Sequence, residues 1–136
     1  MSPKFCIIYI LFDMIKENFI RLFENSIKVN WDEPAFTDYI EEQTLTYAEV
    51  GTEVAKLHLL FDTIGIEKGT KISLIGKNGT NWCVTYIAAV TYGAVIVPIL
   101  QDFNPNDVHH ITNHSESLLL FTGDNFQRVR IFRLIT

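Results

Sequence analysis

Two stretches of the sequence carry residue types that could bind a ligand. The first is Gly76–Thr80, which reads Gly-Lys-Asn-Gly-Thr and lies between an apolar run and a predicted helix. Backbone N–H groups of such a turn can hold a phosphate, and Lys77 would add a positive charge. The spacing matches neither G-x-G-x-x-G nor G-x-x-x-x-G-K-[ST]. We therefore favour a structural turn in which Asn78 or Thr80 caps the helix.

The second stretch contains three histidines, His109, His110 and His114. His110 and His114 are spaced i, i+4, as in helical zinc sites. No glutamate lies between them in the manner of H-E-x-x-H, and the sequence offers no evident third ligand. We therefore favour solvated or hydrogen-bonded histidines over a metal site. The sequence alone assigns no catalytic, cofactor-binding or metal-binding residue.

The composition indicates one globular domain that does not bind nucleic acid. The chain has 136 residues, of which 48% are hydrophobic, and a formal net charge of −5. This length and hydrophobicity allow a buried core, whereas binding to a phosphate backbone needs clustered Lys and Arg. Cys6 and Cys83 form neither a disulfide framework nor a metal motif, which favours a reducing, cytoplasmic compartment. Phe5–Phe12 is too short to be a transmembrane segment and lacks a signal-peptide cleavage site.

Three apolar runs, Ile72–Ile75, Val95–Ile99 and Leu118–Phe121, recur at an even interval. Two segments of helical length and composition, Asn81–Tyr92 and Asn106–His114, separate them. Connections of this length predict parallel strands joined by right-handed crossovers. The predicted fold class is therefore α/β, with a partial doubly wound parallel sheet of about three strands and crossover helices. Because Asn81–Tyr92 is apolar almost all round, we expect it to be covered on two sides.

The segments before the sheet predict an N-terminal helix and a short β-hairpin. Residues 8–27 have the periodicity of an amphipathic helix, and its polar face carries both charge signs. That mixture favours packing on its own domain over a membrane-surface or partner-binding role. The hairpin is expected from Ala35–Ile40 and Gln43–Tyr47. A capping box at Thr46–Glu49 then opens a long helix that ends at Gly65.

These patterns divide the chain into three parts. Residues 1–32 form the N-terminal helix and its lead-in, and residues 33–124 form the α/β region. Residues 125–136 are expected to form a terminal helix over Asn125–Leu134, after a turn at Gly123-Asp124.

A series of short motifs follows the order and spacing of a known family. The motifs are Leu45–Val50, Gly65–Gly69, Gly76–Asn78, Trp82, Ala88-Ala89 and Gly93–Pro98. Together they resemble the opening of the AMP-forming acyl-CoA synthetases, which belong to the adenylate-forming superfamily. The segment Ile111–Glu116 before an apolar strand is similar to the branch that acts on long-chain fatty acids. Members of the family usually have Asp after the glycine that corresponds to Gly69, where this chain has Thr70. This departure affects only a turn and does not weaken the resemblance.

The resemblance implies a parent enzyme, a long-chain fatty-acid–CoA ligase that uses ATP, Mg²⁺ and CoA and passes through an acyl-adenylate. Members of that family are several times longer than this chain. Their phosphate loop, their adenine- and ribose-binding motif and their catalytic lysine lie downstream of the matching region. We therefore expect an N-terminal scaffold fragment that is inactive alone.

Two other functions remain open. One is a free-standing α/β module that binds a nucleotide or a partner through Gly76–Thr80, and the other is a structural or regulatory protein that uses the N-terminal helix. We also expect the chain to form a homo-oligomer, because Asn81–Tyr92, Phe5–Phe12 and Ile131–Ile135 would expose apolar surface beside an unpaired strand edge.

Overall fold

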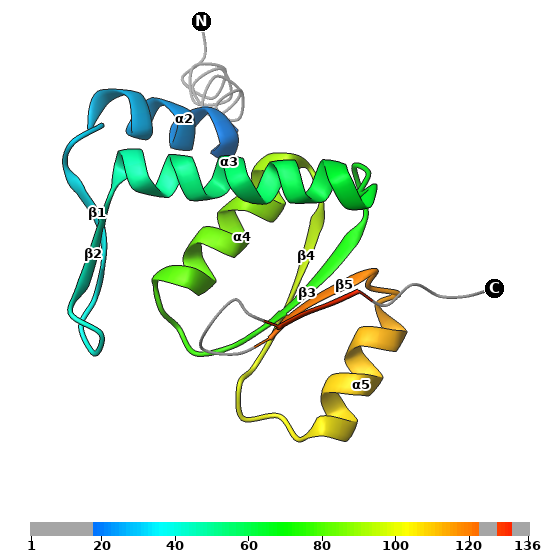
Figure 1. The fold of residues 1–136 in the computed structure, drawn as a ribbon. Helices are drawn as coiled ribbons and strands as arrows, with labels where there is room; N and C mark the ends of the chain where they lie inside the picture. The colour runs from blue at the N-terminus through cyan, green and yellow to red at the C-terminus, as the bar shows by residue number, and fades with distance from the viewer. Residues whose placement is uncertain (1–17, 123–127, 132–136) are drawn as a thin grey trace, which may run out of the picture.

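The computed structural model describes residues 18–122 and 128–131 of the chain (Figure 1). The described chain forms four helices and six strands. They are α2 (Phe19–Val29), β1 (Pro34–Asp38), β2 (Gln43–Thr46), α3 (Tyr47–Ile64), β3 (Lys71–Ile75), α4 (Thr80–Tyr92), β4 (Val95–Ile99), α5 (Pro105–His114), β5 (Leu119–Thr122) and β6 (Arg128–Ile131).

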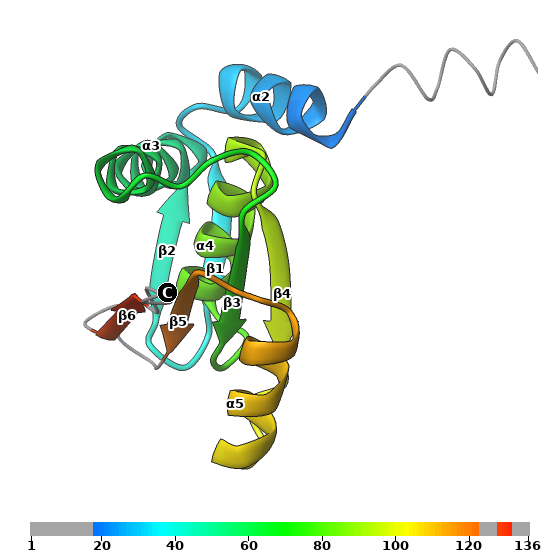
Figure 2. The ribbon, with the colours of Figure 1, turned by 90° about the vertical axis from the view of Figure 1, so that its right-hand side faces the viewer.

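Strands β3, β4 and β5 form the parallel sheet that the sequence predicts. Ile72 of β3 lies opposite Ile96 of β4 on one side and Leu119 of β5 on the other. The strand order is β4-β3-β5-β6, so the chain moves from β3 to β4 through α4 and then returns past β3 to β5 through α5. Figures 1 and 2 show α4 and α5 on opposite faces of the sheet. This reversal of direction makes the fold doubly wound.

The predicted terminal helix over Asn125–Leu134 is wrong for the part that the structure describes. Residues 128–131 form β6, which pairs antiparallel with β5 so that Val129 lies opposite Phe121. The segment alternates polar and apolar residues as Arg-Val-Arg-Ile, a strand period, and the edge of β5 offers it backbone hydrogen-bonding groups. The predicted turn at Gly123-Asp124 lies outside the described residues.

The amphipathic N-terminal helix is present in the described part of its predicted range. Helix α2 begins at Phe19, because Asn18 is extended and its side chain accepts a 2.9 Å hydrogen bond from the Arg21 N–H. Residues 8–17 lie outside the described residues. Phe23 packs against the core, and Ile27 Cγ2 lies 3.5 Å from the position that a Cβ on Gly51 of α3 would occupy. The helix therefore packs on its own domain, although none of its residues is fully buried.

The hairpin and the start of α3 form as predicted. Strands β1 and β2 pair antiparallel, with Thr37 opposite Thr44. The capping box is complete, because the Glu49 N–H donates to Thr46 Oγ1 at 3.3 Å and the Thr46 N–H donates to Glu49 Oε2 at 2.8 Å. Gly65 ends α3 with φ +75°, a left-handed conformation that glycine adopts at little cost.

Helix α4 is covered on two sides, as its apolar circumference predicts. One side faces β3 and β4, and α3 packs against another side. Aromatic rings join the two helices, with Phe61 and Tyr92 centroids 5.2 Å apart. The fully buried core lies between α3, α4 and the sheet and includes Val50, Phe61, Ile72, Ala88, Ala89 and Leu119. The second face of α4 is therefore covered by this chain's own α3. The expectation that Asn81–Tyr92 exposes apolar surface is wrong, because none of its apolar residues is exposed.

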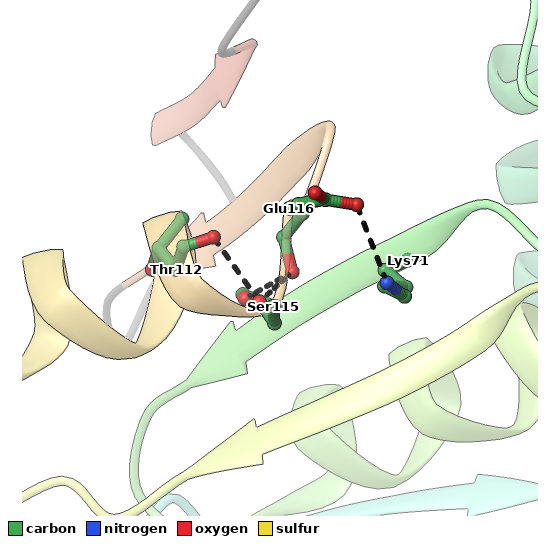
Figure 3. A network of polar contacts seen from close by, with 6 residues as sticks. Lys71, Thr112, Ser115 and Glu116 are labelled. Atoms are coloured by element: carbon green, nitrogen blue, oxygen red, sulfur yellow. Dashed lines mark hydrogen bonds and ion pairs between the residues drawn. The ribbon is translucent and has the colours of Figure 1, made fainter.

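A chain of hydroxyl groups holds the junction between α5 and β5 onto β3 (Figure 3). Buried Ser73 in β3 donates a 2.7 Å hydrogen bond to Ser117, which is 2.7 Å from the hydroxyl of Ser115. Ser115 also donates to the Thr112 carbonyl at 3.1 Å. These bonds satisfy polar groups beneath α5 and fix where that helix ends.

Candidate functional site

A pocket lies at the carboxyl ends of β3 and β5. β3 and β5 are neighbours in the sheet, and the order of the strands reverses between them. In doubly wound folds, ligands usually bind at this switch point. The pocket has a volume of about 160 Å³. Its walls come from the β1–β2 hairpin, the turn after β3, the first turns of α4 and the end of β5, and include Asp38, Ile40, Glu41, Gln43, Leu74, Gly76, Lys77, Gly79, Thr80, Trp82, Thr85, Phe121 and Thr122.

The turn Gly76–Thr80 forms one wall of this pocket, but its capping residue is not the predicted one. Neither Asn78 nor Thr80 caps α4. Gly79 is the N-cap residue, in an extended conformation and with no side-chain hydrogen bond to the helix. Thr80 is instead the first residue of the helix, where its hydroxyl is buried without a hydrogen-bond partner among the described residues. The tight approach of the hairpin to this turn explains why glycine occupies the cap position.

Asp38 brings the hairpin onto the N-terminus of α4. Its Oδ1 accepts hydrogen bonds from the N–H groups of Ile40 at 3.0 Å and Glu41 at 3.1 Å. Its Oδ2 lies 3.0 Å from the position that a Cβ on Gly79 would occupy. A carboxylate there complements the positive end of the helix dipole. Asp38 thus takes the place beside α4 that a phosphate would need, and Glu41 adds a second negative charge to the same pocket.

Apolar and aromatic side chains form the opposite wall. Trp82 stacks on Tyr86 with ring centroids 5.3 Å apart and an interplanar angle of 17°. The buried Thr85 hydroxyl donates to the Asn81 carbonyl at 2.9 Å, so it presents no free donor to the pocket. Phe121 from β5 adds a further ring. The pocket can therefore enclose a small, partly apolar group, and its ionisable lining residues are Asp38, Glu41 and Lys77.

The three histidines of the second candidate stretch lie on α5, away from the pocket lining. His109 is exposed and its ring lies within hydrogen-bonding distance of the Asn113 amide, at 3.2 Å. The rings of His110 and His114 face each other with centroids 5.8 Å apart and an interplanar angle of 12°. Within residues 18–122 and 128–131, no cluster of three or more His, Cys, Asp or Glu side chains could hold a metal ion.

Cys83 is the cysteine within the described residues, and it does not line the pocket. Cys83 lies on α4 and is partly buried, and this burial raises the pKa of its thiol. A raised pKa lowers the thiolate fraction at neutral pH and so makes the thiol less reactive. Cys6 and the apolar run Phe5–Phe12 lie outside the described residues. Across the described part of the chain, no helix combines the length and the apolar character needed to cross a membrane.

The spacing of residues in the sequence does not reveal one polar cluster, which lies between α3 and α4. His58 Nε2 lies 3.0 Å from the Ala88 carbonyl and 3.0 Å from Thr91 Oγ1. The Tyr92 hydroxyl donates to Asp62 Oδ1 at 2.5 Å and lies 3.1 Å from the Ile66 carbonyl. These residues are about thirty positions apart in sequence, so only helix packing brings them together. Their contacts fix the relative position of two helices and do not line the pocket.

The chain is similar to known proteins over much of its length. Residues 23–134 match the family model described as "AMP-binding enzyme". Long chain acyl-CoA synthetase 3 of Arabidopsis thaliana is 32% identical over 80 residues, which are 59% of this chain and 12% of that protein. Long-chain-fatty-acid–CoA ligase FadD13 of Mycobacterium tuberculosis is 28% identical over 93 residues, 66% of this chain and 18% of that protein. The chain thus spans less than a fifth of these relatives.

The fold also matches solved structures. The inhibitor-bound N-terminal domain of FACL13 from Mycobacterium tuberculosis superposes with a TM-score of 0.71 at 23% identity. The match covers 76% of this chain and 26% of that one. At this identity the likeness concerns the fold, which agrees with the α/β arrangement described above.

Proposed function

The chain belongs to the family of AMP-binding enzymes, and we propose that it is the N-terminal portion of a long-chain fatty-acid–CoA ligase. The observation that carries this proposal is the family match over residues 23–134, together with acyl-CoA ligases among the relatives. Long-chain specificity is supported by two of these relatives and by the resemblance at Ile111–Glu116. The parent would activate a fatty acid with ATP as an acyl-adenylate and transfer the acyl group to CoA, in the cytoplasm.

The described residues do not fit a site for ATP with Mg²⁺. The N-terminus of α4 already faces the Asp38 carboxylate, and Glu41 lines the same pocket. A triphosphate would meet two negative charges there, against the single positive charge of Lys77. We infer that the groups that bind ATP, Mg²⁺ and CoA belong to other parts of the parent protein.

The described chain then serves as a scaffold. Motif Leu45–Val50 forms the end of β2 and the first turn of α3, and motif Gly93–Pro98 forms the end of α4 and most of β4. Both motifs therefore build the junctions between helices and strands and lie outside the pocket lining. A scaffold role accounts for motifs that combine capping residues, glycines and strand formers.

Pyrophosphate release from ATP and a long-chain fatty acid tests the proposed inactivity of the chain alone. We expect no release above a control without protein. Turnover above that control would contradict the scaffold role.

The DNA sequence after the codon for Thr136 tests the proposal that the chain is part of a longer ligase. A continuous frame that encodes a Ser/Thr/Gly-rich loop followed by lysine would support the ligase. A stop codon with no such frame nearby would favour the alternative, a free-standing nucleotide- or partner-binding module, and calorimetric titration with ATP would then decide whether a nucleotide is its ligand.

A further inference from the structure

Helix α5 presents two imidazoles on one exposed face. His110 and His114 are one helical turn apart, so their side chains project from the same side of the helix. Both residues are exposed, and their rings face each other with centroids 5.8 Å apart. Among the described residues, neither ring has a hydrogen-bond partner that a bound ligand would have to displace, whereas the neighbouring His109 ring lies within hydrogen-bonding distance of the Asn113 amide.

We propose that His110 and His114 form a two-imidazole chelate for a late first-row transition-metal ion such as Ni²⁺ or Cu²⁺. A neutral imidazole carries one unprotonated nitrogen that can bind a metal ion, and rotation about the side-chain torsions can bring the nitrogens of the two rings onto one ion. Because the second nitrogen binds within the same molecule, its effective concentration is high and the pair binds more tightly than two separate histidines. Water fills the remaining positions at this exposed face.

The ligand set selects the class of metal. Imidazole suits Ni²⁺, Cu²⁺ and Zn²⁺, whereas Mg²⁺ and Ca²⁺ prefer oxygen ligands. Asp107 lies on the same stripe of the helix, one turn before His110. Its Oδ2 already accepts a hydrogen bond from the Asn104 side chain at 2.5 Å, within the cap of α5. The proposed chelate therefore has two protein ligands, which agrees with the absence of a three-residue metal cluster from the described structure.

The position of the pair at the end of α5 favours a bound cation. His114 is the last residue of the helix, at the end where the helix dipole is negative. The next residue, Ser115, starts the hydroxyl network that attaches this end of the helix to β3 (Figure 3). A metal ion that bridges His110 and His114 would stabilise the last turn of α5, which directly precedes that attachment.

Calorimetric titration with Ni²⁺ tests the proposal, using the whole chain without an affinity tag at pH 7.5 in a buffer that does not bind metals. We expect one ion per chain at the site, and at least tenfold weaker binding in His110→Gln and in His114→Gln, because each variant loses one arm of the chelate. His109→Gln is the matched control, since it removes an exposed imidazole of the same helix from a different face. Its affinity should stay within about twofold of the wild type, as expected for a residue outside the chelate.

Circular dichroism of each variant shows whether α5 substitutions leave the fold intact, which we expect because the three side chains are exposed. Titration with Zn²⁺ followed by NMR of the imidazole C–H signals provides a test on the unaltered chain. Two of its four histidines should respond together. Equal losses in all three variants, unchanged binding in His110→Gln and His114→Gln, or a response of all four histidines would overturn the proposal.

Discussion

The Asp38 carboxylate lies against Gly79, with Oδ2 3.0 Å from the position of a Cβ at that glycine. This contact joins the hairpin to the N-terminus of α4 and closes one side of the pocket. It depends on the absence of a side chain at residue 79 and on the turn that Asp38 makes with the N–H groups of Ile40 and Glu41. Glycine is needed here for close approach and not for a positive φ, since Gly79 is extended.

Gly79→Ala should therefore destabilise the fold by about 1 kcal/mol, because alanine is a poorer N-cap residue than glycine and its methyl group must displace Asp38. Urea denaturation measures the change. In a double-mutant cycle with Asp38→Ala, part of this cost should disappear, since the carboxylate is no longer present. Strictly additive effects of the two substitutions would show that the contact contributes nothing.

Thr46→Ala should lower the free energy of unfolding by about 1 kcal/mol, because it removes the side-chain cap of α3. Thr52→Ala is the control. Thr52 is an exposed threonine of the same helix, and its hydroxyl donates only to the Ala48 carbonyl of the preceding turn. We expect its unfolding free energy to stay within about 0.5 kcal/mol of the wild type. Thermal or urea denaturation distinguishes the two outcomes, and equal losses in both variants would contradict the capping role.

Tyr92 should make stability fall at alkaline pH. Its hydrogen bond to the Asp62 carboxylate, together with burial, raises the pKa of the Tyr92 hydroxyl above its ordinary value. The folded state therefore retains this proton to a higher pH than the unfolded state does. The stabilisation is fully present below the unfolded pKa of about 10 and is lost as pH rises through the folded pKa.

Urea denaturation at pH 8 and at alkaline pH tests this dependence. Tyr92→Phe should lose less stability than the wild type over that interval, because the variant has no phenol at this position. Tyr39→Phe is the matched control, since Tyr39 is 92% exposed at the hairpin, and we expect it to follow the wild type. Identical pH profiles for the wild type and Tyr92→Phe would refute the assignment.

Lys77→Ala should leave any measurable affinity for ATP unchanged, because the turn it belongs to is faced by Asp38 and serves the fold. A lysine that binds phosphate contributes a charge-assisted hydrogen bond of about 1.5–3 kcal/mol, roughly a tenfold or greater effect on affinity. Isothermal titration with ATP makes the comparison. A tenfold loss in the variant would instead support a nucleotide-binding module.

The chain should self-associate through apolar side chains and not through the outer edge of β4, which has no partner strand among the described residues. The Val95 N–H donates to Thr70 on the side of β3, so the alternate residues Ile96 and Pro98 face the free edge. Pro98 has no N–H, which leaves few donors there for an added strand. Outward apolar side chains of α2, such as Leu22 and Val29, the latter 81% exposed, offer a surface for association instead.

Sedimentation equilibrium at low micromolar concentration should give at least a dimer. The combined substitution of Leu22→Ser and Val29→Ser should weaken it, whereas Leu59→Ser, at an exposed leucine on α3, should not. A clean monomer of the unaltered chain would mean that the chain covers its own apolar surface.

Local signals in the sequence determined most of the elements. The capping box at Thr46–Glu49 fixed the start of α3, because both of its hydrogen bonds span only three residues. The spacing of three apolar runs was sufficient for a parallel sheet, since connections of that length exclude hairpins. The i, i+4 spacing of His110 and His114 likewise placed both rings on one face, because helical geometry alone decides it.

Only the tertiary structure decided the features that depend on residues far apart in sequence. Residues 128–131 form a strand because they pair with the edge of β5. This pairing overrides the helix that we predicted from the apolar residues of the same segment. Gly79 caps α4 because Asp38, forty-one positions earlier, occupies the space beside it. Spacing in the sequence could not give these outcomes, because a side chain's partner across the fold is set by packing, and packing follows from all the elements together.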